Sequence, residues 1–369
     1  MKKIAIAVAA AMTAAAAGAA DVSIYGIVDT GLGYTHTNTL DAPTENKFEM
    51  INGFNSGSRF GLKGTEDLGN GYAVSFILEN GFASDAGTLG QNDRMFGRES
   101  QIKFHTPYGT MSFGRAGTLL SGAGSLEVFG TYADTLPGGW DGIFNIGNYQ
   151  GNGQRLDNMV TYQTPTAAGF TGYVQYSFAN DTKDDDTDSV ANTRDTNRYF
   201  AAGLTYANGP VNAVVIYDTT MYKHYPNEDQ NVGDGRSLSV GGSYDFGSVR
   251  VSAYGQYFKG ARTAYGEDIW QEGYYHDADG YNFHLGAKIA LPCGRLSVAG
   301  YYGKLEVNDV AENDEATNWN VMIAHEYDLS KRTLVYSGVS FRQVKAEDDD
   351  SKYFDKKTTQ VVVGLRHAF

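Results

Sequence analysis

Charged side chains are unevenly distributed along this 369-residue chain, and their distribution suggests what chemistry it can do. The segment 117–152 carries three acidic residues and no Lys or Arg: Glu127, Asp134 and Asp141. Single basic residues recur elsewhere, mostly inside segments that alternate apolar and polar positions: Arg59, Lys63, Arg115, Arg155, Arg250, Lys288, Arg342 and Arg366. Opposite charges about 4 Å apart interact by about 4 kcal/mol at an effective dielectric near 20. If the fold brings these groups together, they could filter charged solutes.

Enzymatic and metal chemistry find little support in the sequence. No G-x-S-x-G or H-E-x-x-H motif occurs, and the 7 His are scattered. The acidic runs 184–186 and 348–350 lack the spacing of a calcium loop, and we interpret them as solvated loops, with divalent-cation binding as the alternative. Cys293 is the single cysteine, which excludes a disulfide framework and a thiolate metal cage. We therefore expect no enzyme, metal or cofactor.

Composition excludes two further classes of protein. Against 43 Asp+Glu the chain has 29 Lys+Arg, a formal net charge of −14, and a nucleic-acid binder would instead show a basic face. After residue 20 no apolar run approaches the ~18 residues of a transmembrane helix. The mean hydropathy of −0.37 excludes only a helical membrane protein. In a strand with one apolar and one polar face, the hydropathy values of the two faces cancel in the mean.

The first 20 residues have the pattern of a secretory signal peptide. Lys2 and Lys3 form a basic start, an apolar stretch follows, and small residues at 17–19 fit an A-x-A cleavage pattern. We expect cleavage after Ala19 or Ala20. The remaining residues, 21–369, are predicted to form a single domain.

Strict alternation of apolar and polar residues dominates the rest of the chain. It is clearest in the segments 22–34, 249–257, 281–289 and 319–327. A period of two residues indicates strands with one apolar face. Short Gly-, Pro- and Asn-containing turns recur between these strands at 67–71, 106–109, 165–169, 207–210, 245–248, 291–295 and 328–332. Long polar connections alternate with them at 37–56, 83–95, 117–152, 180–197, 219–235, 259–279, 306–317 and 344–357. Seven short and eight long connections predict sixteen strands.

A soluble β-sandwich could also alternate, but two features favour a transmembrane barrel. The short and long connections alternate regularly, which places all long loops at one end. Aromatic residues, 13% of the chain, gather near strand ends. Both are typical of an antiparallel up-and-down barrel, in which closure satisfies every backbone group in the hydrocarbon core.

Four motifs resemble the neisserial-type general porins of β-proteobacteria. DVSIYGIVDTG at 21–31 is similar to their first strand, and SRFGLKGTEDLGN at 58–70 to their second strand and first turn. FGRAG at 113–117 resembles the strand before their constriction loop, and VVVGLRHAF at 361–369 their last strand. The resemblance implies a sixteen-stranded outer-membrane barrel of a Gram-negative bacterium, usually a homotrimer, with the long third loop folded into the pore. It also implies that the terminal Phe369 is an assembly signal.

The resemblance assigns the charged residues to a pore constriction. It places Glu127, Asp134 and Asp141 on the loop, where YADTLPGG at 132–139 is similar to the family's acidic tip, although Gly138 stands where a second acid is expected. Arg59 and Arg115 match wall positions of the family. Lys63 shares the parity of Arg59, and Arg155 lies on the strand after the loop. The residues that strand parity points towards the lumen, without a constriction assignment, are Asp29, Arg250, Lys288, Arg342 and Arg366.

The function implied is passive diffusion of small hydrophilic solutes and ions. Basic charge at the narrowest ring, where Gly138 replaces an acid, favours a weak anion preference. A substrate-selective channel for sugars, phosphate or dicarboxylates is the alternative, since Tyr254, Tyr301 and Tyr302 could form an aromatic path. A barrel enzyme would need an assembled site, which the sequence does not contain. Expected partners are outer-membrane lipid, lipopolysaccharide and the outer-membrane assembly machinery, with no nucleic acid.

Overall fold

Alternating apolar and polar side chains give a sheet with two different faces, and such a sheet can close around a polar interior. The computed structural model describes residues 21–121, 124–126, 128–136, 140, 155–181, 196–223, 233–262, 277–307, 315–347 and 352–369. The predicted signal peptide lies outside these residues. In the described part of the chain, no helix is both long and apolar enough to cross a bilayer.

Seventeen strands and two short helices make up the described structure. The strands are β1 Asp21–Thr39, β2 Glu45–Asn52, β3 Arg59–Gly69, β4 Tyr72–Gly81, β5 Glu99–Thr106, β6 Gly109–Gly117, β7 Arg155–Gln163, β8 Phe170–Ser177 and β9 Arg198–Asn208. They continue as β10 Val211–Met221, β11 Gly235–Asp245, β12 Val249–Arg262, β13 Asp277–Leu291, β14 Gly294–Val307, β15 Glu315–Asp328, β16 Thr333–Glu347 and β17 Lys352–Ala368. The helices are α2 Gly90–Asp93 and α3 Val128–Ala133.

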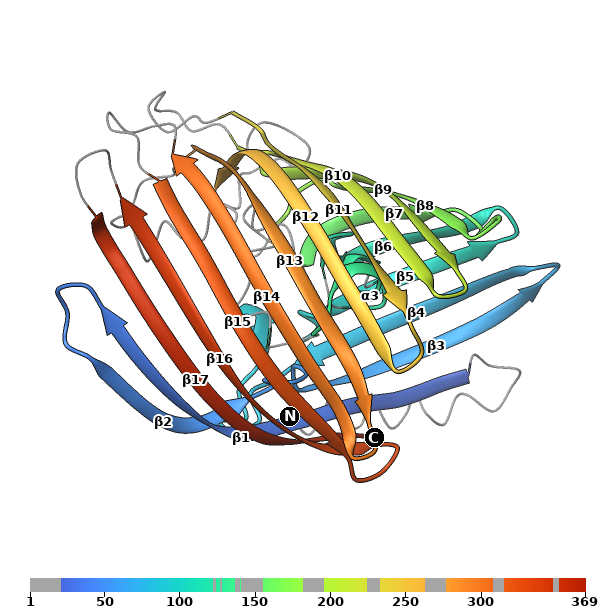
Figure 1. Cartoon of the computed structure of the whole chain (residues 1–369). Helices are drawn as coiled ribbons and strands as arrows, with labels where there is room; N and C mark the ends of the chain where they lie inside the picture. The colour runs from blue at the N-terminus through green and yellow to red at the C-terminus, as the bar shows by residue number, and fades with distance from the viewer. Residues whose placement is uncertain are drawn as a thin grey trace.

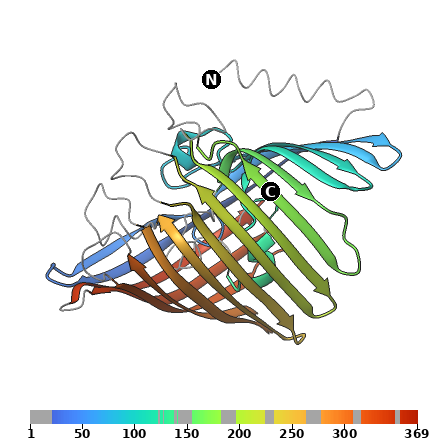
Figure 2. The ribbon, with the colours of Figure 1, turned by 90° about the horizontal axis from the view of Figure 1, so that it is seen from above.

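All strands belong to one antiparallel sheet that closes on itself. β1 pairs with β17 over a long register that runs from Ile27↔Ala368 to Thr39↔Lys356. The first and last strands therefore lie side by side, blue against red (Figure 1), and the strands slant round the barrel in the second view as well (Figure 2). The predicted closed barrel is confirmed.

One wall strand of the barrel is interrupted, which explains why seventeen strands occupy sixteen positions. β2 and β3 both pair with β1, through Thr30↔Asn52 and Ile27↔Arg59, and residues 53–58 leave the sheet between them. The prediction that 37–56 is one polar connection is wrong, because β2 lies within this segment. Only Phe48 and Met50 are apolar on its outer face, and charged neighbours concealed the alternation.

The two faces of the sheet have the predicted chemistry. On β1 the side chains of Val28 and Leu32 are exposed on the outside, whereas Asp29 between them is buried inside. The seven short turns lie at one end, as between Thr106 of β5 and Gly109 of β6. At the other end several strands extend into segments that the sequence predicts as long connections. β16 ends at Glu347 and β17 begins at Lys352, both within the predicted connection 344–357. Their polar outer ends resemble loops in sequence because they extend past the apolar band.

Candidate functional site: the lumen and its third long connection

The third long connection lies against the inner face of the barrel wherever it is described. α3 packs on β10, β11 and β12, and Figure 1 places it within the ring of strands. Leu119 and Phe129 join a buried cluster with Tyr199 and Ile216 of the wall. The backbone N–H of Leu119 donates to Oε1 of Gln175 at 2.8 Å. Apolar packing and a buried amide thus fix the first half of the connection to the wall.

Asp134 directly follows α3 and faces the β13–β14 wall. Its Oδ1 accepts the backbone N–H of Thr135 at 2.6 Å and lies 3.4 Å from the Tyr301 hydroxyl. The Thr135 hydroxyl lies 2.9 Å from Nε2 of His284. A Cβ on Gly286 would come within 2.3 Å of that hydroxyl, so only glycine allows this approach. The sequence placed Asp134 on the connection, and the structure shows its wall partners.

Trp140 anchors the far side of the connection. Its ring packs edge-on to Phe54 at 4.6 Å and to Tyr336 at 6.1 Å between centroids. Its Nε1 donates to Oδ1 of Asn55 at 2.8 Å, and Asn55 donates in turn to Glu326 at 3.0 Å. A Cβ on Gly338 would overlap the indole, which explains the glycine there.

The interruption at 53–58 supplies the seat for Trp140, and Asp29 holds this segment in place. The Oδ2 of Asp29 accepts the backbone N–H of Ser56 at 2.7 Å, and its Oδ1 accepts the Tyr336 hydroxyl at 2.7 Å. Arg366 donates from Nε to the Ser56 hydroxyl at 3.1 Å. Asp29 and Arg366 therefore face the interior, and they hold an internal segment there.

A basic cluster occupies the wall formed by β3 to β7. Glu79 accepts Nε of Arg98 at 2.6 Å and lies 3.9 Å from Nη1 of Arg59. Arg155 lies close enough to interact electrostatically with two cations and two acids, namely Arg98, Arg59, Glu79 and Glu99. Of the predicted basic residues, Arg59 and Arg155 are thus brought together, and Arg98 joins them.

A second ion cluster lies beside the first. Nη1 of Arg115 donates to Oδ1 of Asp157 at 2.6 Å, while Nη1 of Arg94 lies 3.2 Å from the other carboxylate oxygen. Arg94 also pairs with Asp181. The Nε of Arg115 donates to the Gly97 carbonyl at 2.7 Å, which ties this cluster to the segment that carries Arg94 and Arg98. Arg115 sits at a bulge in the β6–β7 pairing, where simple parity fails.

The remaining predicted residues lie apart from these clusters. Lys63 is exposed four positions nearer the short turn, 5.0 Å over the Tyr25 ring. Arg250 donates to the Thr131 carbonyl of α3 at 2.5 Å, and Lys288 is its cross-strand neighbour. Arg342 donates to Asn318 at 3.4 Å. Glu127, Asp141 and Gly138 lie outside the described residues.

Sequence reasoning missed Arg94, Arg98, Glu79 and Asp157. Arg94 lies within, and Arg98 just beyond, the segment 83–95, which the sequence predicts only as a polar connection. Glu79 sits in a strand among apolar residues, where a buried acid needs a cationic partner. That isolated acid was the available signal for an inward-facing ion pair.

The chain end also closes the barrel. Phe369 and Gly26 exchange two backbone hydrogen bonds of 3.0 and 3.1 Å. The Phe369 ring lies so close over Gly26 that a Cβ there would overlap it. The terminal residue is therefore part of the seam between β1 and β17.

A closed antiparallel barrel with an apolar outer face and a charged interior defines an outer-membrane channel. The chain belongs to the Gram-negative porin family, whose model matches residues 5–347. It is 34% identical to an outer membrane porin protein of Bordetella pertussis over 98% of both chains. It is 28% identical to a major outer membrane protein of Neisseria meningitidis serogroup B over the full length of both.

Solved structures support the same conclusion. The anion-selective porin from Comamonas acidovorans matches with a TM-score of 0.70 and 25% identity, covering 95% of this chain and all of that one. The protein is an outer-membrane diffusion porin of a Gram-negative bacterium, a channel and not an enzyme. The resemblance noted in the sequence is confirmed.

Proposed function

We propose that this porin passes small hydrophilic solutes and ions with a weak anion preference, which the arginines of the β3–β7 wall set. The observation that carries the proposal is the gathering of Arg59, Arg98 and Arg155 around Glu79, with Arg94 and Arg115 close by. Charge at the narrowest part of a pore decides which ions enter it. The relative described as an anion-selective porin supports the same sign.

Asp134 supplies the opposing charge in this proposal. It contacts β13 and β14, which lie at least five strands from the basic wall in either direction round the barrel. A field directed across the lumen would orient dipolar solutes. Glu127 and Asp141 are proposed to add to the acidic side.

The reversal potential of the purified porin in a salt gradient tests the ion preference. With potassium chloride more concentrated on one side, we expect a sign that corresponds to excess chloride current. The preference should shrink as salt rises, because the Debye length falls from about 10 Å at 0.1 M to about 3 Å at 1 M. A potential of the opposite sign at low salt would contradict the proposal.

A substrate-selective channel finds no support in the lumen aromatics. Tyr254, His284 and Tyr301 do gather there, with ring centroids 4.4 to 6.4 Å apart. However, His284 and Tyr301 contact Thr135 and Asp134, so these rings hold the connection. Tyr302 faces outwards, so the expected aromatic path is not assembled as the sequence suggested.

We further propose that the porin is a homotrimer and that it contacts lipopolysaccharide and the outer-membrane assembly machinery. A trimer form is described for OmpT of Vibrio cholerae, which shares 15% identity and the fold. The proposed signal for assembly is Phe369, on the residue parity of the outward-facing Val361, Val363 and Leu365.

Deleting Phe369 is expected to lower the amount of folded barrel in the outer membrane several-fold while export to the periplasm continues. The deletion removes two backbone hydrogen bonds at the seam, of about 1 kcal/mol each, together with the ring and the proposed signal. Heat-dependent gel mobility of membrane fractions measures the folded porin. Phe369→Tyr is the matched control and should assemble normally. Normal folded levels in the deletion variant would refute the assembly role.

A further inference from the structure

Two basic side chains face each other on the outer surface of the barrel. Arg236 of β11 and Lys259 of β12 are direct register partners, on the same face as the exposed Leu238 and Tyr257. Like charges directly opposite each other destabilise a strand pair. Among the described residues, Arg236 has no acidic partner, so an anion supplied from outside would relieve the repulsion.

Both side chains line a polar pocket of about 600 Å³, together with Tyr217, Thr219, Gly233, Asp234, Gly260 and Asp279. Asp279 pairs with Lys259 and not with Arg236. Its Oδ1 accepts the backbone N–H of Gly260 at 2.9 Å, and its Oδ2 lies 3.7 Å from Nζ of Lys259. The pocket lies at the long-connection end of the strands, which is the extracellular end in porins. Tyr217 and Tyr257 are exposed beside the pocket, as in the aromatic girdle at a membrane interface.

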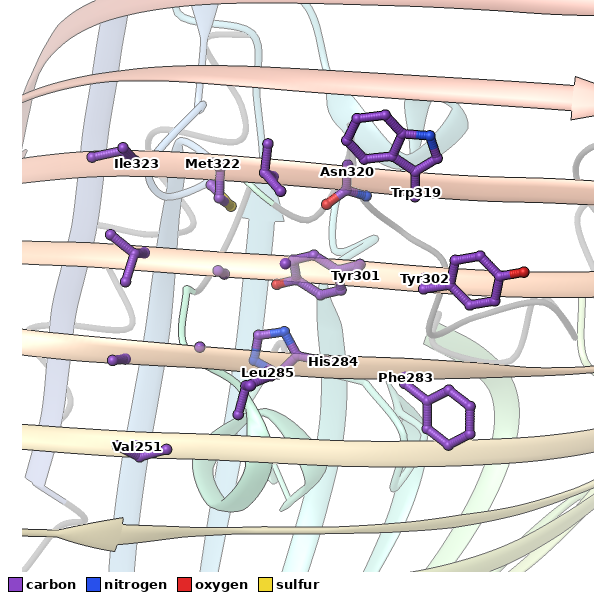
Figure 3. Close-up of a pocket in the computed structure, with 16 residues that line it drawn as sticks. Val251, Phe283, His284, Leu285, Tyr301, Tyr302, Trp319, Asn320, Met322 and Ile323 are labelled. Atoms are coloured by element: carbon purple, nitrogen blue, oxygen red, sulfur yellow. The ribbon is translucent and has the colours of Figure 1, made fainter.

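An apolar groove of about 820 Å³ lies on the same outer face, two strands further on (Figure 3). Trp319, Tyr302 and Phe283 stand side by side on β15, β14 and β13 near one end of it (Figure 3). Its other exposed walls are Leu285, Val321 and Ile323.

Gly300 forms the floor of this groove, and packing does not require a glycine there. A Cβ on Gly300 would meet its nearest atoms at 3.7 and 3.9 Å, which is ordinary contact. Gly286 on the neighbouring strand differs, since its Cβ would overlap Thr135. What the missing side chain of Gly300 provides is space on the lipid side.

We propose that this part of the wall binds one phosphorylated, acylated lipid of the outer leaflet. The phosphate lies between Arg236 and Lys259, and an acyl chain runs down to the groove over Gly300. Strand geometry separates the two sites by about 20 Å along the strands and about 10 Å across them, which suits a headgroup and its chain. The inference rests on the proposed contact with lipopolysaccharide and gives that contact a location.

The test is lipid binding to delipidated, detergent-solubilised porin, followed by native mass spectrometry with diphosphorylated lipid A. We expect the double variant R236Q/K259Q to bind about thirtyfold more weakly, the effect of removing two cations at a membrane surface. Lys304→Gln is the matched control, because Lys304 is an outward-facing cation already paired with Glu315 at 2.6 Å. Its lipid binding should not change.

Gly300→Leu provides a second, independent test of the lipid site. This variant should fold normally, because the position has room for a side chain. Filling the groove is expected to weaken binding while heat-dependent gel mobility stays that of the folded barrel. The proposal is overturned if R236Q/K259Q binds lipid A as the wild type does, or if dephosphorylated lipid A binds equally well. Inorganic phosphate is the competitor that tests for a free-phosphate site. If it displaces lipid A with an affinity equal to that of lipid A, the site binds free phosphate and the proposal is also overturned.

Conductance separates this inference from the proposed ion preference. Arg236 and Lys259 face away from the lumen, so the reversal potential of R236Q/K259Q is expected to equal that of the wild type. A shifted potential in that variant would place these cations on the ion path and overturn the lipid assignment. A wild-type potential of the wrong sign would contradict only the ion preference.

Discussion

Truncating Trp140 to alanine is expected to raise the single-channel conductance and to make the open current noisier. The indole packs against Phe54 and Tyr336 and donates to Asn55 at 2.8 Å. Removing a buried tryptophan costs about 3–5 kcal/mol, and here the loss falls on the contacts that seat the third connection. The connection should then leave the inner wall for part of the time. Planar-bilayer recordings of both proteins in the same salt measure the effect.

Trp319→Ala is the matched control for this experiment. Trp319 faces outwards, with its Nε1 donating to Gln343 at 3.1 Å, and truncating it removes the same volume on the lipid side. Its conductance should remain that of the wild type. If the two variants conduct alike while both retain the heat-dependent mobility of a folded barrel, Trp140 does not restrain the connection.

Replacing Arg59, Arg98 and Arg155 together with glutamine is expected to convert the anion preference into a cation preference. The change removes three positive charges and leaves Glu79 without the cations that face it. Each charge acts on an ion about 8 Å away by about 0.5 kcal/mol in water, so three amount to about 1.5 kcal/mol. That is about tenfold in the partition of each ion, in opposite directions for anion and cation. Reversal potentials at low salt measure the ratio.

The charge-conserving variant R59K/R98K/R155K separates charge from packing in the same positions. Lysines cannot reproduce the guanidinium geometry, but they retain three positive charges and should retain the anion preference. Lys63→Gln removes a cation four positions nearer the short turn and should have a smaller effect. If the glutamine variant folds and keeps the wild-type reversal potential, the wall arginines do not set selectivity.

The sequence predicted the barrel because its signals are local. Alternation of Val28 and Leu32 with Asp29, together with turn chemistry such as Gly109 at a φ of +134°, depends only on neighbouring residues. β2 escaped prediction because its alternation rests on two apolar side chains among charged ones. The outward side chains followed from the period of two, and the strand count followed from the alternation of short and long connections.

The candidate site was predictable only in part. Arg59 and Arg155 could be placed on the wall from the sequence. Arg98 could not, because its place in the cluster depends on the contact between Glu79 and the segment after α2. Arg115 sits at a bulge, so parity could not decide which way it faces. The groove over Gly300 depends on a missing side chain and on the two neighbouring strands, which no single segment contains.

By itself, the sequence determined a closed sixteen-position barrel with an apolar outside and a charged inside, because periodicity and turns are properties of adjacent residues. Only the tertiary structure decided which charges meet and where the third connection is seated. Asn55 and Trp140 are 85 positions apart, and Asp29 and Tyr336 are 307 apart. Contacts over such separations depend on closure of the barrel and on the inward course of 53–58, which bring distant strands within reach of one lumen.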